Sequence, residues 1–98
     1  MTLVSSRWPL LAAELKTALL DEGENALAAQ IDDLRALKEC GCGDGFCQGF
    51  YTQPPPRGAY GPGHRNVGLN PAGPGMLILD VVDNLIMYVE VIDRPPLA

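Results

Sequence analysis

Hydrophobic residues in the first third of the chain recur at the spacing of one helical face. Leu11, Leu15 and Leu19 are four residues apart, so in a helix they form a single apolar stripe. Pro9 precedes the stripe and suits a first turn, because its missing N–H lies where no intrahelical hydrogen bond is made. This pattern predicts a helix over residues 9–21 whose apolar stripe belongs to the core.

The next segment predicts a second, shorter helix. Gly23 is of a residue type that commonly ends a helix. Leu27 and Ile31 then share one face of a helix over residues 24–31. The helical pattern stops after two aspartates, and we predict a strand over residues 34–43.

The last quarter of the chain changes to a pattern typical of β-structure. Residues 76–82 and 85–92 are both dense in Val, Ile, Leu and Tyr, and Asp83-Asn84 stands between them. Asp and Asn tolerate the positive φ that a two-residue hairpin turn requires. We therefore predict an antiparallel hairpin that turns at this Asp-Asn pair.

Strict alternation along this hairpin leaves both of its faces largely apolar. It pairs Asp80 with Met87 and sends Asp80 and Glu90 to opposite faces, which excludes two carboxylates that share a proton. Two short helices cover only one face of a sheet, so the second face needs other cover. We expect a homodimer through the C-terminal hairpin. The alternative is that segment 53–75 folds back over this face.

That segment contains the runs PPP, GAYGPGH and NPAGPG, in which Pro and Gly are too dense for a helix. Only residues 64–70 have the composition of a short edge strand, through Val67 and Leu69. Together, these patterns predict a single α+β domain over residues 1–98. Two N-terminal helices pack on an antiparallel sheet of about four strands.

One run of sequence, KECGCGDGFCQGFYTQ, contains all three cysteines of the chain. A two-residue turn at its Asp-Gly pair is a preferred hairpin turn. Alternation then places Cys40, Cys42 and Cys47 on one face of a ribbon. Zn²⁺ takes four ligands in tetrahedral geometry, with thiolate and imidazole among its usual donors. These cysteines and His64, the chain's single histidine, therefore form a candidate zinc site.

Other uses of the thiols remain open. Free cysteines pack as small buried hydrophobes, and the spacing C-x-C-x4-C-x16-H matches no common zinc motif, so packing is favoured over zinc. A cross-strand disulfide between Cys42 and Cys47 is sterically allowed and would be easily reduced. Nothing in the sequence activates Cys47 as a nucleophile beside His64. We therefore predict no catalytic residues.

Charge excludes one class of partner. The chain has 7 Lys and Arg against 12 Asp and Glu, a net charge of −5, whereas non-specific nucleic-acid binding requires a basic surface. Arg57 and Arg65 lie in its mildly cationic middle and are candidates for contact with an anion or an acidic partner. Either of them is also the expected hydrogen-bond partner of Asp80, which stands on an apolar face.

Hydropathy indicates a protein that does not enter a membrane. With 47% hydrophobic residues the chain can form a core, yet no apolar stretch reaches the length of a membrane span. The N-terminus lacks the order of charge and apolar residues of a signal peptide. We expect a cytoplasmic protein, where thiols normally stay reduced.

The runs CGCGDGFCQGFYT, GPGH and MLILDVVDNLIMYVEV resemble a family of short, uncharacterised bacterial proteins with a C-x-C-G-D segment, a further Cys, F-Y-T and a closing hairpin. The resemblance implies a bacterial origin and an α+β domain, and it brings no activity. The function that we expect is that of a non-enzymatic binding or interaction module, zinc-stabilised at the cysteine hairpin. The alternatives are a redox- or metal-responsive protein that uses the clustered thiols, and an acidic immunity or antitoxin-like protein that binds a partner.

Overall fold

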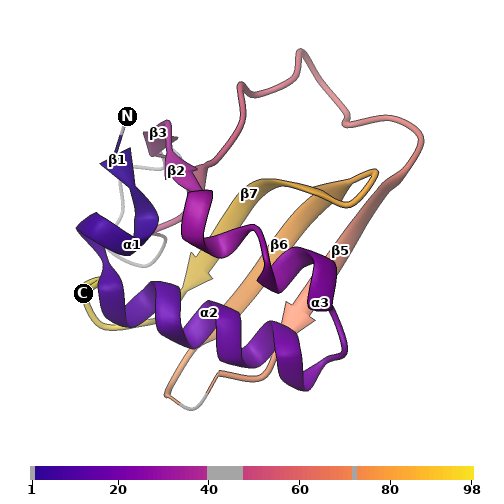
Figure 1. Cartoon of the computed structure of the whole chain (residues 1–98). Helices are drawn as coiled ribbons and strands as arrows, with labels where there is room; N and C mark the ends of the chain where they lie inside the picture. The colour runs from indigo at the N-terminus through magenta and orange to yellow at the C-terminus, as the bar shows by residue number, and fades with distance from the viewer. Residues whose placement is uncertain (1, 40–47, 72) are drawn as a thin grey trace.

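The computed structural model describes residues 2–39, 48–71 and 73–98 (Figure 1). The helical elements come first in the chain. They are α1 (Val4–Arg7), α2 (Pro9–Asp21), α3 (Asn25–Ala28) and a 3₁₀ turn, η1 (Ile31–Asp33). No helix of the described residues is long and apolar enough to cross a membrane.

The strands form two antiparallel sheets. A small one pairs β1 (Thr2–Leu3) with β2 (Arg35–Ala36). Among the described residues the larger has five strands in the order β3-β4-β7-β6-β5. Their bounds are Lys38–Glu39 for β3, Phe50–Tyr51 for β4, His64–Leu69 for β5, Met76–Val82 for β6 and Leu85–Ile92 for β7.

Several sequence predictions are confirmed. Helix α2 has the predicted bounds, begins with Pro9 at its first position and is followed by Gly23 at a φ of +75°. The C-terminal hairpin turns at Asp83-Asn84, whose φ angles of 49° and 65° are both positive, as its two-residue turn requires. Strand β5 lies at an edge of the sheet, as its composition indicates.

Other details of the prediction are wrong. The chain adds α1, and the second helix is only Asn25–Ala28 before η1. In place of one strand over 34–43, the described residues hold two short strands that belong to different sheets. The larger sheet has five strands rather than about four, because β5 extends the hairpin sheet on one side and β3 and β4 extend it on the other.

An irregularity in the hairpin changes which residues share a face. Val82 pairs with Leu85 as predicted, but Asp80 pairs with Tyr88 rather than Met87, because the register shifts between Asp80 and Val81. Such a β-bulge inserts one extra residue, here Met87, and reverses the alternation beyond it. Glu90 consequently lies on the same face as Asp80, and the predicted separation of the two carboxylates is wrong.

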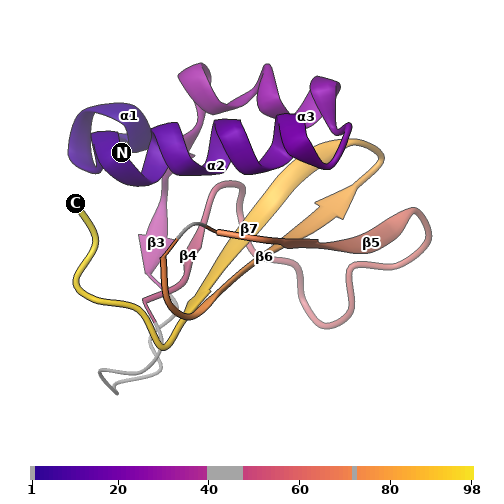
Figure 2. The same ribbon diagram turned by 90° about the horizontal axis from the view of Figure 1, so that it is seen from below.

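The helices and the 3₁₀ turn cover one face of the larger sheet (Figure 2). The core lies between these two layers. It is centred on Leu15, Leu19, Phe50 and Leu79, which are fully buried. The ring of Trp8 packs 5.0 Å from that of Phe50 between centroids. The C-terminal segment is tied to α2, because the Ala98 carbonyl accepts the Leu11 N–H and Arg94 pairs with Glu14.

Candidate functional site

The opposite face of the larger sheet has no helix against it, and we call it the open face (Figure 2). Cross-strand pairing shows which residues share it, since paired residues point to the same side. Its side chains are half-buried to exposed, whereas the apolar side chains pointing to the helices are buried. The open face comprises Lys38, Tyr51, His64, Asn66, Gly68, Met76, Ile78, Asp80, Val82, Leu85, Tyr88, Glu90 and Ile92.

Asp80 is the centre of a polar cluster on this face. Its Oδ1 accepts a hydrogen bond from Asn66 Nδ2 at 2.6 Å and lies 2.8 Å from His64 Nε2. Asn66 is the direct cross-strand partner of Asp80, so the sheet register itself places the donor there. The Asp80 side chain is only 17% exposed. A carboxylate this far from water needs such donors, because desolvation otherwise disfavours its charge.

The segment before β5 returns over part of the open face. The Tyr60 ring lies 4.8 Å from that of His64 between centroids. The pKa of Tyr60 is raised, first because burial disfavours the phenolate and then because Asp80 and Tyr51 would repel it. This supports the expectation that the Pro/Gly-rich segment covers this face, but only at one end. Met76, at the other end, is 49% exposed.

Two further tyrosines lie side by side on the open face. Tyr51 and Tyr88 are cross-strand partners with ring centroids 4.6 Å apart. Tyr88 lies so close to Gly49 that a Cβ there would come 2.2 Å from the Tyr88 hydroxyl. The absence of a side chain at Gly49 therefore lets the Tyr88 ring lie along the sheet.

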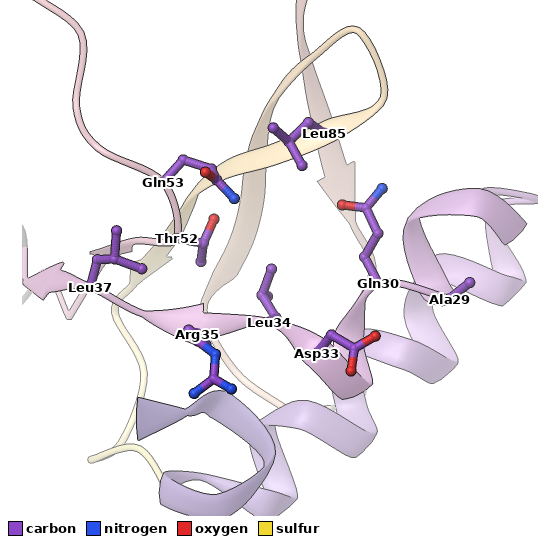
Figure 3. Close-up of a pocket in the computed structure, with 9 residues that line it drawn as sticks. All are labelled: Ala29, Gln30, Asp33, Leu34, Arg35, Leu37, Thr52, Gln53 and Leu85. Atoms are coloured by element: carbon purple, nitrogen blue, oxygen red, sulfur yellow. The ribbon is translucent and has the colours of Figure 1, made fainter. Parts of the chain in front are cut away.

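A hollow of about 460 Å³ lies at the end of the sheet between η1 and the start of β7 (Figure 3). Leu34, Leu37 and Leu85 give it apolar walls, and Thr52 points into it. The polar groups at this point are largely used within the fold. Thr52 Oγ1 donates to the Ile86 carbonyl at 2.8 Å, and the Gln30 amide accepts from the Ile86 N–H and donates to the Asn84 carbonyl.

The predicted zinc ligands are not brought together by the described residues. Cys40, Cys42 and Cys47 lie outside the described part of the chain, and so does the predicted turn between them. Within the described residues there is no group of three or more His, Cys, Asp or Glu side chains that could hold a metal ion. The zinc site and the disulfide alternative therefore stay predictions, and His64 is placed beside Asp80.

The two candidate arginines lie in different surroundings. Both Nη atoms of Arg65 donate to the Glu24 carboxylate, each at 2.9 Å, on the helix-covered side. Arg57 is exposed and makes no ion pair with any described residue. The expectation that one of them bonds Asp80 is wrong, because the register of β5 places Asn66 and His64 there instead.

Sequence reasoning missed three residues that lie on or against the open face. Tyr51 and Asn66 lie on it because of the pairing between strands, and Tyr60 lies against it because the segment before β5 returns over this face. One signal was present in GAYGPGH, where an aromatic residue stands four positions before the only histidine. The chain matches no protein-family model, and no curated protein or solved structure is significantly similar to it.

Proposed function

We propose that the chain is a non-enzymatic interaction module that binds a cationic segment of a partner protein across the open face. The observation that carries this proposal is the one-sided cover of the sheet, which leaves Asp80 and Glu90 among Tyr51, Tyr60 and Tyr88. Tyrosine is enriched in the residues that carry most of the energy of protein interfaces.

Charge supports a cationic rather than an anionic partner, because the open face carries two carboxylates, Asp80 and Glu90, against one lysine, Lys38. Glu90 makes no hydrogen bond or ion pair with another described residue, and the whole chain carries a net charge of −5. Carboxylates beside aromatic faces attract Lys and Arg both by ion pairing and by cation–π contact. This proposal agrees with the acidic, partner-binding alternative from the sequence, and the resemblance to short bacterial proteins remains a prediction beside it.

The experiment measures binding of a fluorescein-labelled oligo-arginine peptide by anisotropy, with an oligo-glutamate peptide of equal length as the negative probe. The variant Asp80→Asn with Glu90→Gln is expected to weaken binding by about tenfold or more, equivalent to about 1.4 kcal/mol. The matched control Asp21→Asn with Glu22→Gln removes the same charge from exposed residues at the end of α2. Equal losses in the two variants would show only a general charge effect and reject the open face.

Zinc at the cysteine hairpin is a separate proposal that rests on the residue types alone. The native mass spectrum of the intact protein distinguishes added zinc, the loss of two hydrogens by a disulfide, and free thiols. If zinc supports the fold, a chelator lowers the melting temperature, because metal binding adds to folding free energy. An unchanged melting temperature would remove zinc as a structural element.

A further inference from the structure

The outer edge of β5 is a long, regular edge of the larger sheet. Strand β5 pairs with β6 through six consecutive residue pairs without an irregularity. On its other side no strand of the described residues lies against it. An edge of this kind presents backbone N–H and C=O groups in the geometry that another strand requires.

The hydrogen-bond pattern shows which groups point outward. The Asp83 N–H donates to the Gly63 carbonyl at 3.3 Å, which extends the ladder between β5 and β6. In an antiparallel pair the bonded residues alternate. Residues 65, 67 and 69 therefore bond to β6, and the backbone groups of Asn66 and Gly68 face away from the sheet.

The usual devices that keep sheet edges apart are missing from β5. Its sequence, HRNVGL, contains neither Pro nor Lys, and the β-bulge of the sheet lies between β6 and β7. Its one permanent charge, on Arg65, is neutralised by the Glu24 carboxylate. At Gly68 an added Cβ would project from the open face and meet nothing within 4 Å, so a substitution can be made in this strand without a clash.

We propose that two copies of the chain associate through the outer edges of β5, forming one continuous antiparallel sheet. In the register centred on Val67, Asn66 exchanges both backbone hydrogen bonds with Gly68 of the partner subunit. The two-fold axis is then perpendicular to the sheet. Both α2 helices lie on the same side of it.

One feature favours a second copy over a foreign strand. An antiparallel edge is its own complement, so the outward groups of Asn66 and Gly68 in one copy match those of Gly68 and Asn66 in the other. This interface uses β5 rather than the faces of the C-terminal hairpin, and it leaves the open face free for the proposed cationic partner.

Sedimentation equilibrium over a wide concentration range tests the proposal with two substitutions at one position. Gly68→Pro removes the outward N–H without touching the ladder to β6, because the residues that bond to β6 are its neighbours. Gly68→Ala adds a Cβ but keeps the N–H. We expect wild type and Gly68→Ala to form dimers, and Gly68→Pro to shift the dimer dissociation constant upward by at least about tenfold, because each copy loses one outward N–H and the dimer therefore loses two hydrogen bonds.

A wild-type chain that stays monomeric at high concentration would overturn the proposal, as would a Gly68→Pro variant that dimerises like wild type. If circular dichroism shows that Gly68→Pro does not fold, Gly68→Lys takes its place. A Cβ at this position meets nothing within 4 Å, and Lys is a residue type that keeps natural edge strands from pairing. Unchanged dimerisation of that folded variant would equally reject the interface.

Discussion

At one edge of the larger sheet, the structure describes two residues of β3, Lys38 and Glu39, which are charged and exposed, and Glu39 pairs with Arg7. At the other edge, β5 offers six residues in regular pairing, and its one permanent charge is bound by Glu24. Lysine on an edge strand disfavours pairing with an incoming strand. Over the described residues, Lys38 therefore disfavours association at the β3 edge, whereas the β5 edge permits it.

Strand β4 pairs with β7 only at Tyr88 and Val89. Past the end of β4, at Ile86, side chains rather than a strand occupy this side of β7. The Ile86 backbone is satisfied at both of its groups, by Thr52 at the carbonyl and by Gln30 at the N–H. These groups would otherwise be open to pairing, as those of Asn66 and Gly68 are. Substitutions on this side are therefore expected to change folding stability, and substitutions at the β5 edge to change association.

The largest expected effect is at Phe50 in β4. Its ring is fully buried against Trp8, so Phe50→Ala removes apolar contacts and leaves a cavity. We expect the free energy of unfolding to fall by about 3–5 kcal/mol, measured by urea denaturation of the monomer at low concentration. Phe50→Leu is the matched control and is expected to lose less. A loss below about 1 kcal/mol for the alanine variant would show that β4 is not part of the cooperative fold.

An intermediate effect is expected at Thr52, which closes the end of β7. Thr52→Val keeps the shape of the side chain but removes the hydroxyl that donates to the buried Ile86 carbonyl. The unsatisfied acceptor is expected to cost about 1–3 kcal/mol of unfolding free energy. Thr52→Ser retains the donor and serves as the control. Equal stability of the valine variant and wild type would mean that this bond does not close the edge.

The smallest effect concerns the Arg65–Glu24 pair at the β5 edge. Arg65 lowers the pKa of Glu24 below its ordinary value of 4.5. Since the pKa of Glu24 is lowered by folding, its contribution is present above that value and is lost as the pH falls through the folded pKa. We expect Glu24→Gln to destabilise the chain slightly at neutral pH, and the difference from wild type to vanish in acid. High salt should shrink it as well.

The same variant bears on association. With Glu24 neutral, the charge of each Arg65, which lies opposite Leu69 of the partner subunit in the proposed register, is no longer compensated. Both edges then carry an unpaired cation, so dimerisation should weaken modestly at low salt. Sedimentation at two salt concentrations measures this effect. Tighter association of Glu24→Gln than of wild type would contradict the idea that Glu24 neutralises a charge on Arg65 that otherwise opposes pairing of the β5 edges.

Sequence reasoning predicted those elements whose signal is local. The apolar stripe of α2, the Asp83-Asn84 turn and the edge position of β5 all follow from short-range spacing and turn chemistry. The pairing of β4 with β7 joins residues far apart in the chain, and no local pattern specifies it. The bulge at Met87 was missed because a period of two cannot show an inserted residue.

The candidate site follows the same division. Asp80 was recognised as an unusual carboxylate on an apolar face, but its partners depend on the register between β5 and β6. Glu90 was placed on the wrong face because the β-bulge at Met87 reverses the alternation of side chains beyond it. The predicted cysteine ligands lie outside the described residues, so their arrangement stays a prediction from alternation and turn chemistry alone.

Amide hydrogen exchange along β5, followed by NMR at low and high protein concentration, tests the association edge most directly. We predict strong protection of the Val67 N–H at both concentrations, because it bonds to β6. The N–H groups of Asn66 and Gly68 should exchange rapidly when dilute and become protected when concentrated. Rapid exchange of these two amides at every concentration would contradict the proposal that the β5 edges of two chains pair.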